Sequence, residues 1–233
     1  APPRGDEAKK NPFNTFDIGR DFCNKTCNAT RLILSSADDS MKSATGGQAE
    51  LADRWIQSRF NRVTAQVTES LDAFRFNDAS RAVYDFIWHD FCDWYLEMIK
   101  PRIDKGGDDK AFVLRNAADI LAGAMKLLHP VMPHISEDIW QRLTDATGER
   151  DAESIMVAPW PAPDPGAVDD DIEKRMALLQ SLITTIRTLR NELNVPLGKK
   201  ADVVVVPVDD ATKAIFEVNS PYIVDLAKVN NLT

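Results

Sequence analysis

Apolar residues recur at helical spacing through most of positions 15–150, and this repeat favours a helical fold over any sheet. The clearest window is 51–74, where successive apolar residues are four, three, four, four and three positions apart: Ile56, Phe60, Val63, Val67, Leu71 and Phe74. A helix with about 3.6 residues per turn places such residues on one face. The spacing therefore predicts an amphipathic helix over 51–74.

Four more windows in this part of the chain show the same periodicity. They cover 15–35, 77–100, a stretch from the IDKGGDDK loop to Pro130, and 133–147. We expect Pro101 to end the aromatic-rich third helix, because proline disfavours helical geometry in the residue before it. Five helices with short connections predict a bundle over 15–150. We expect Trp94 in its core.

The composition changes on both sides of this bundle. Residues 1–14 are rich in proline, glycine and charge, without apolar periodicity, and we expect a flexible lead there. Residues 151–168 hold too many prolines for a regular element. They predict a linker between the bundle and a second unit.

The segment 169–233 combines helical and strand patterns. Three aspartates at its start favour a long helix. The run ADVVVVPV at 201–208 favours a strand, and two later stretches have a helical pattern, 211–218 and 221–229. These features predict a small α/β module. Because one strand cannot form a sheet, we expect partner strands after Thr233.

The net charge of -8 argues against a protein that binds nucleic acid nonspecifically over its whole surface. Between positions 9 and 62, however, basic side chains outnumber acidic ones, whereas 151–233 is acidic. We therefore expect an anionic partner to bind the N-terminal part, away from the acidic C-terminal part.

The sequence also bears on the cellular compartment. No apolar run approaches the roughly 18 residues of a membrane helix, so we expect no membrane partner. The chain has three cysteines and its first residues lack the apolar core of a signal peptide. An odd cysteine count without a secretory signal favours the reducing cytoplasm.

Two groups of chemically versatile residues have an ordinary structural alternative. A zinc site is conceivable from Cys23-x3-Cys27 with His89-x2-Cys92, but buried core cysteines are the more common use. An acid–base cluster is conceivable around His129 and His134, but the neighbouring prolines favour a tight corner between helices. We expect no metal site and no catalytic residues.

A third group is basic and aromatic. It comprises Arg31 in the first helix and four residues of the second, Arg54, Trp55, Arg59 and Arg62. Such a set can bind phosphates and stack unpaired bases. The alternative is a solvated arginine face beside a core tryptophan.

Four segments resemble the anticodon-binding region of valyl-tRNA synthetases. They are TFDIGRDFCNKTCNATRL (15–32), LADRWIQSRFNRV (51–63), YDFIWHDFCDWYLEMIKPRI (84–103) and LLHPVMPHISEDIWQRL (127–143). A fifth, IRTLRNELNVPLGKKADVVV (186–205), resembles the small domain that follows. The resemblance implies a mainly α fold, the anticodon-binding helical bundle of class I aminoacyl-tRNA synthetases, followed by a small α/β module.

The resemblance also implies a role within a larger enzyme. Such an enzyme esterifies valine to its tRNA with ATP and magnesium, while this region binds the anticodon stem-loop, whose anticodon has a middle adenine. The chain contains neither a HIGH-type nor a KMSKS-type signature. We therefore expect a C-terminal fragment that is inactive alone, needs no cofactor, is monomeric, and works beside the catalytic domain of its parent chain.

The resemblance places two residues against the anticodon loop, Arg31 of the N-A-T-R block and Trp55 of the L-A-D-R-W block. With their weaker neighbours, the expected RNA-contacting set is Arg31, Trp55, Asn28, Asp53, Arg54, Arg59 and Lys25. An asparagine amide can meet an adenine edge and an arginine supplies charge and donors. Two other functions stay open: a helical protein-interaction scaffold without RNA specificity, and a stand-alone metalloenzyme.

Overall fold

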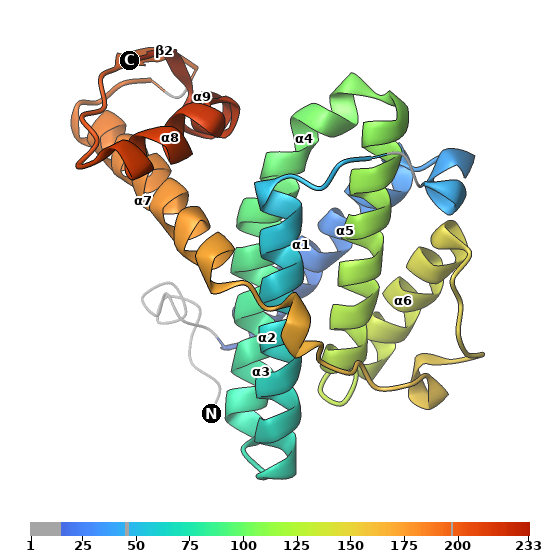
Figure 1. Cartoon of the computed structure of the whole chain (residues 1–233). Coiled ribbons are helices and arrows are strands. Elements are labelled where there is room, and N and C mark those ends of the chain that lie inside the picture. The colour runs from blue at the N-terminus through green and yellow to red at the C-terminus, as the bar shows by residue number, and fades with distance from the viewer. Residues whose placement is uncertain (1–14, 45–46, 197) are drawn as a thin grey trace, which may run out of the picture.

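The computed structural model describes residues 15–44, 47–196 and 198–233. Figure 1 shows a helical bundle joined through α7 to a smaller C-terminal unit that contains a short sheet. The predicted fold class, a mainly helical bundle followed by a small α/β module, is confirmed. The expected flexible lead at 1–14 lies outside the described residues.

The bundle is built from helices close to those that the apolar spacing predicts. Their bounds are α1 (Thr15–Ser36), η2 (Asp39–Ser43), α2 (Leu51–Asp72), α3 (Phe76–Asp85), η3 (Phe86–Tyr95), α4 (Leu96–Lys105), α5 (Gly107–Leu128) and α6 (Pro133–Thr147). The largest fully buried side chains are Trp140, Tyr95, Phe86 and Phe91. Burying each such side chain stabilises the fold by about 1.5–3 kcal/mol.

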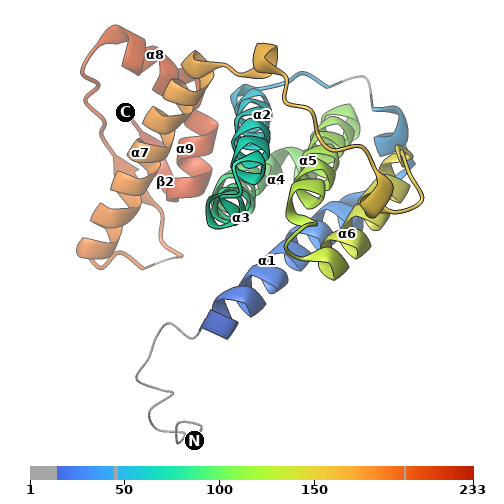
Figure 2. The ribbon, with the colours of Figure 1, turned by 90° about the horizontal axis from the view of Figure 1, so that it is seen from below.

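The helices of the bundle pack mainly as antiparallel neighbours. Helix α2 forms a hairpin with α3, and α5 packs against α2, α4 and α6. Helix α1 crosses beneath α5 and α6 and also contacts η3 (Figure 2). One end of α6 is defined by Gly148, which takes a left-handed conformation (φ 78°) and donates its N–H to Thr144. Glycine adopts this conformation without a steric penalty.

The prediction that Pro101 ends a helix is wrong. The helix that begins at Phe76 continues through η3, a π-helical segment, and α4 to Lys105, with Pro101 inside α4. Ile99 and Ile103 are buried on either side of the proline. Burial of the two isoleucines, about 1.5–3 kcal/mol each, offsets the roughly 3 kcal/mol that an interior proline costs.

Residues 151–168 lie along the bundle rather than away from it. They contain two short 3₁₀ turns, η4 (Ile155–Val157) and η5 (Pro165–Ala167), and η5 contacts α2. The Trp160 indole N–H donates to the Thr68 hydroxyl at 2.9 Å, and the Asp164 backbone N–H donates to the Asn61 side chain at 2.8 Å. This segment therefore delivers the chain to the start of α7 along a defined path.

Helix α7 (Asp170–Glu192) leads from the bundle to the C-terminal module. Asp169 caps it by accepting hydrogen bonds from the backbone N–H groups of Asp171 and Ile172. The apolar stripe that the sequence predicts is buried: Ile172, Met176, Leu179, Ile183 and Ile186. The first turns of α7 pack on α2, and the later turns pack on α9.

The module contains β1 (Ala201–Val203), α8 (Asp210–Val218), α9 (Ser220–Ala227) and β2 (Val229–Leu232). Strands β1 and β2 pair in parallel. The predicted strand 201–208 is too long, and the predicted helix 221–229 ends early because Lys228 adopts a left-handed conformation (φ 54°). The expectation of a single strand is also wrong, since β2 follows this turn.

None of the helices in the described ranges is both long and apolar enough to cross a membrane.

Candidate nucleic-acid interface

A groove of about 700 Å³ lies between α1, the η3–α4 helix and α7. We call it the α1–α4–α7 groove, and its walls include Lys25, Asn28, Leu32, Cys92, Trp94, Lys100 and Arg187. Its volume is within the range of sites that hold a small ligand or part of a larger one. The bundle supplies two of its walls, and Arg187 of α7 supplies the third.

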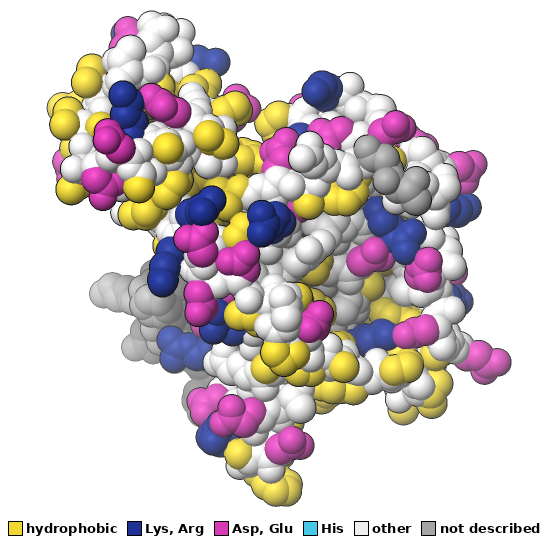
Figure 3. All heavy atoms as spheres, in the orientation of Figure 1, with side chains coloured by type: hydrophobic (Ala, Val, Ile, Leu, Met, Phe, Trp, Pro, Cys, Tyr) yellow, Lys and Arg dark blue, Asp and Glu magenta, His cyan; other side chains and the backbone are white. Residues whose placement is uncertain are grey.

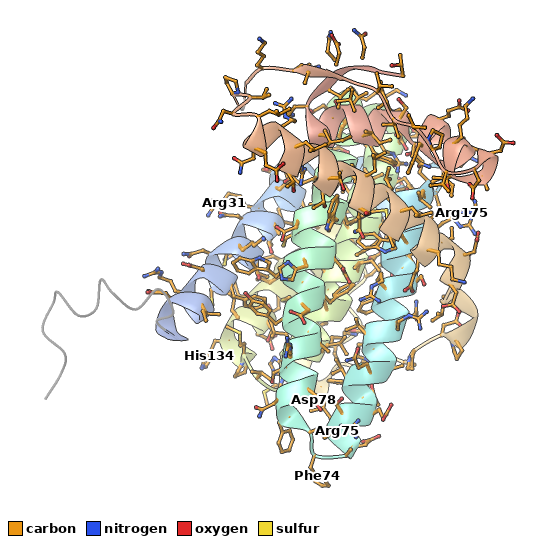
Figure 4. The ribbon with its side chains drawn as sticks, turned by 90° about the vertical axis from the view of Figure 1, so that its left-hand side faces the viewer. Arg31, Phe74, Arg75, Asp78, His134 and Arg175 are labelled. Atoms are coloured by element: carbon orange, nitrogen blue, oxygen red, sulfur yellow. The ribbon has the colours of Figure 1, made fainter. Side chains whose placement is uncertain are left out.

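Two of the expected RNA-contacting residues line this groove, and a third is bonded to one of them. Lys25 and Asn28 line it, and the Arg31 guanidinium donates to the Asn28 side-chain oxygen at 3.0 Å. They share a face of α1 because residues three or four apart along a helix are neighbours. Arg31 is exposed, and Figure 4 shows it projecting from α1. Among the described residues it has no carboxylate within ion-pair distance.

Lys25 is less available than Arg31. Its ammonium forms an ion pair with Asp93 and lies 4.0 Å from the centre of the Trp88 ring. A cation over an aromatic face is held by the ring's quadrupole. The charge of Lys25 is therefore largely committed to the helix opposite α1, and the lysine works as a link between the two walls.

The opposite walls add an aromatic ring and two cations. Trp94 is half-buried in η3, and the Arg187 guanidinium of α7 lies 5.6 Å from the centre of its ring. The Arg187 Nε also donates to the Leu226 carbonyl at 2.9 Å. Lys100 pairs with Glu97 at 2.5 Å. The expectation that Trp94 lies in the core holds only in part, because its side chain packs against the core but is half-buried and also lines the groove.

The arginines of α2 lie elsewhere and are paired within the molecule. Arg54 pairs with Asp169 at 3.2 Å, and Arg59 with Asp90 at 2.9 Å. Arg62 pairs with Glu173 at 3.1 Å. The structure therefore does not bring Arg54 or Arg59 to the groove. These arginines hold the start of α7 against α2.

Arg59 of α2 also faces a half-buried carboxylate of η3, Asp90. Burial raises the pKa of Asp90, and the facing guanidinium of Arg59 opposes that shift. The hydrogen bonds from Arg62 to Glu173 and Asp170 raise the pKa of that guanidinium above its usual value. On the face drawn in Figure 3, basic and acidic side chains are interleaved and form no continuous basic patch.

Asp53 and Trp55 are both inside the bundle. Asp53 is 0 % exposed and accepts hydrogen bonds from the Tyr95 hydroxyl at 2.9 Å and from Arg102 at 2.5 Å. Trp55 is 3 % exposed, on the same buried stripe as Ala52 and Ile56. An exposed stacking platform at Trp55 is therefore a wrong expectation, and Asp53 joins α2 to α4 within the core.

The cysteines differ from one another in exposure. Cys92 is buried, which raises the pKa of its thiol to about 12, whereas Cys23 is half-buried and Cys27 is exposed. The alternative of three core cysteines is thus wrong for Cys27. Within the described ranges, no three or more His, Cys, Asp or Glu residues lie together as a metal ion would require.

Of the two histidines near the proline corner, His134 is exposed and His129 is half-buried. The His129 ring nitrogen lies 2.8 Å from the Ser136 hydroxyl, which also donates to the Met132 carbonyl. Ser136 is 0 % exposed. This arrangement supports a structural corner between α5 and α6, since the hydroxyl is bonded to backbone and cannot meet a substrate.

The chain is similar to known proteins over most of its length. Residues 53–205 match the family described as the anticodon-binding domain of tRNA ligase. The chain is 36% identical over 236 residues to a valine–tRNA ligase of Synechocystis sp., covering 97% of this chain and 26% of that protein. It is 38% identical over 232 residues to the one of Symbiobacterium thermophilum, covering 92% and 25%.

A third valine–tRNA ligase, of Carboxydothermus hydrogenoformans, is 38% identical over 220 residues, covering 93% of this chain and 24% of that protein. The chain thus spans about a quarter of the length of the relatives that it matches.

Proposed function

Since the chain belongs to the family of anticodon-binding domains of tRNA ligases, we propose that it binds the anticodon stem-loop of valine tRNA as part of a valine–tRNA ligase. Loop bases of an RNA are unstacked, so a protein can read their edges directly. The proposal assigns this recognition to the α1–α4–α7 groove and its rim.

The observation that carries the proposal is the exposed guanidinium of Arg31, which is hydrogen-bonded to the neutral side chain of Asn28. Arg31 has no carboxylate partner in the part of the chain that the structure describes, whereas Arg54 and Arg59 each have one. A cation without a partner can bind a phosphate without first losing an ion pair. The Asn28 amide has both donors and acceptors, which suits the edge of an adenine.

The proposal gives this chain binding and no chemical step. In the parent enzyme, activation of valine with ATP and magnesium would belong to the catalytic domain, beside which this chain would act as a monomeric unit in the cytoplasm. The sequence of 233 residues contains neither of the signatures expected for ATP binding in such enzymes. The chain alone should therefore bind tRNA without charging it.

The test compares two RNA hairpins. We expect the chain to bind the valine anticodon stem-loop more tightly than the same hairpin with its middle anticodon adenine changed, at both low and moderate salt. Loss of each base contact should weaken binding by about 1–3 kcal/mol. Equal binding that falls steeply with salt would mean phosphate contacts alone, and would contradict anticodon reading by this chain.

One observation favours a second function, docking to another protein. At the α2–α3 turn Phe74 is 79% exposed and Phe76 is 59% exposed, with their rings 6.2 Å apart. Figure 4 shows this turn at the end of the molecule opposite the C-terminal module. Substituting Phe74→Ser should leave anticodon preference intact, so a loss of RNA binding in this variant would contradict the separation of the two surfaces.

A further inference from the structure

An RNA-reading groove needs a flat apolar surface on which an unpaired base can stack. Trp55, which the sequence suggests for this role, is buried. Of the tryptophans in the described residues, Trp94 is the one that lines the α1–α4–α7 groove. Its helical neighbours Phe91 and Tyr95 are both 0 % exposed. The groove wall therefore turns one ring of this aromatic cluster outward.

The helical geometry around Trp94 is unusual. Trp94 lies near the end of η3, which is π-helical over Phe86–Tyr95. Such segments are rare, and they occur frequently at functional sites because they change the direction of the side chains that follow. In this helix, Trp94 is half-buried and lines the groove beside two fully buried aromatic residues.

A cation from the other unit lies over this ring. The Arg187 guanidinium is 5.6 Å from the centre of the Trp94 ring, within the range of a cation–π interaction. Its Nε donates to the Leu226 carbonyl at the end of α9, which fixes the direction of the side chain. Arg187 is exposed, and no carboxylate of the described residues lies within ion-pair distance of it.

We propose that Trp94 and Arg187 together form the base-stacking platform of the groove, so that α7 completes the RNA site of the bundle. The inference rests on the proposed function and adds to it the residues that hold the base. The ring supplies a stacking surface, and the planar guanidinium supplies a second surface and free donors for a phosphate. Both units of the chain are then needed for one binding site.

Stacking can be measured with a fluorescent base. The 233-residue chain is titrated into valine anticodon hairpins that carry 2-aminopurine at one loop position each. We expect at least one position to be quenched on binding to the wild-type chain. Trp94→Leu should abolish that quenching and weaken binding about tenfold, as stacking energies predict. Trp94→Phe, which keeps an aromatic face, should restore part of both.

The arginine is tested without touching the core. Arg187 is exposed, so Arg187→Gln should fold as the wild type does while weakening binding and reducing the quenching. Arg187→Lys keeps the charge and loses the planar surface, so it should keep the salt dependence and reduce the quenching as Arg187→Gln does. A lysine variant with full quenching would overturn the role of the guanidinium plane.

Matched controls use the same residue types elsewhere. Trp160 is 39% exposed and bonded to Thr68, and Arg175 lies on α7 but is paired with Asp171. Trp160→Leu and Arg175→Gln should leave binding and quenching unchanged. Normal binding and quenching in Trp94→Leu would overturn the proposed stacking platform but leave the proposed anticodon binding intact. A wild-type chain without preference for the valine hairpin would instead contradict the proposed function.

Discussion

Whether an arginine of this chain can meet an RNA depends on the carboxylates around it. Arg31 and Arg59 both lie on exposed sides of helices in the sequence pattern, yet Arg59 is paired with Asp90 and Arg31 is bonded to the neutral Asn28. Sequence spacing gives the helical face of a residue but not the identity of its long-range partners. The carboxylates that engage the arginines of α2 lie up to 115 positions away.

At Arg31 we predict a large effect on RNA and a small one on stability. Arg31→Ala should weaken binding of the valine hairpin by about 1–3 kcal/mol and reduce the salt dependence. The melting temperature should change little, because the side chain is exposed. Arg81, which is exposed on α3, is the matched control. An equal loss in Arg81→Ala would point to overall charge and contradict a site at Arg31.

At Asp53 we predict the opposite pattern. Asp53 is fully buried between the Tyr95 hydroxyl and Arg102. Burial acts to lower the pKa of Arg102, but its hydrogen bonds to Asp109 and Asp53 outweigh this and raise it, so the guanidinium stays charged. Asp53→Ala leaves that charge without one partner and should cost about 3 kcal/mol of unfolding free energy.

Urea unfolding of Asp53→Ala measures this loss. The fraction of Asp53→Ala that is folded should keep its preference for the valine hairpin. Asp53→Asn, which retains the shape of the side chain, should keep the same preference. If Asp53→Ala has wild-type stability but binds RNA more weakly, Asp53 contacts the RNA, as the sequence suggested.

The sequence predicts part of this site and misses the rest for identifiable reasons. The resemblance picks out Lys25, Asn28 and Arg31, which the structure places together on α1. Trp55 lies outside the apolar stripe that the spacing marks on α2, so its burial beside Ala52 and Ile56 was not apparent from that stripe. Arg187 could not have been found, because it reaches the groove only through the packing of the C-terminal module.

At the scale of elements, apolar periodicity predicts helices well and their ends less well. Helix α1 and the buried stripe of α7 agree with the predictions. The continuous helix across Pro101 and the strand β2 do not, because both depend on tertiary contacts. A local preference is overridden where burial on both sides outweighs it. The π-helical turn of η3 has no signal in a pattern of apolar residues.

The contact between α2 and α7 leads to a prediction about charge. Glu173 lies 3.1 Å from Arg62 and 3.5 Å from Arg59, and it accepts a hydrogen bond from Ser58 at 2.6 Å. Glu173→Ala should destabilise the fold and remove one of the two carboxylate partners of each guanidinium, which leaves Arg59 with Asp90 and Arg62 with Asp170. RNA binding at low salt should then become tighter while the preference for the valine anticodon decreases.

Hairpin titrations at two salt concentrations measure this change. Glu217→Ala on α8 removes the same charge from an exposed site and serves as the control. If both variants gain the same RNA affinity, the effect is one of net charge and the loss of a carboxylate partner by Arg59 and Arg62 is not its cause.

At the scale of the whole molecule, the proposed binding site depends on how the C-terminal module is packed against the bundle. Helix α9 contacts α4, and the Tyr222 hydroxyl of α9 donates to Glu50, just before α2. Burial, together with this hydrogen bond, raises the pKa of the Tyr222 hydroxyl above its usual range, so it remains a donor at neutral pH. The packing of the C-terminal module against the bundle therefore fixes the position of Arg187, which is bonded to the Leu226 carbonyl of α9.

We predict that Tyr222→Phe loosens the module without unfolding the bundle. The lost hydrogen bond should cost about 1 kcal/mol. Amide hydrogen exchange should quicken in α8 and α9 and stay unchanged in α5, and affinity for the valine hairpin should fall modestly because Arg187 is held less firmly. Uniformly faster exchange in all helices would show instead that the two units unfold as one.

Binding of a ligand in this groove also affects how firmly the bundle and the C-terminal module are held together. A ligand that contacts both sides of a joint binds the closed form better than the open one, so by linkage it strengthens the joint itself. At a hundred times its dissociation constant, a bound RNA would add up to about 2.7 kcal/mol to the closed arrangement. If the proposed RNA site is correct, the seam between bundle and module is therefore tightest when the RNA is bound, and the RNA would act as a structural clamp on the protein.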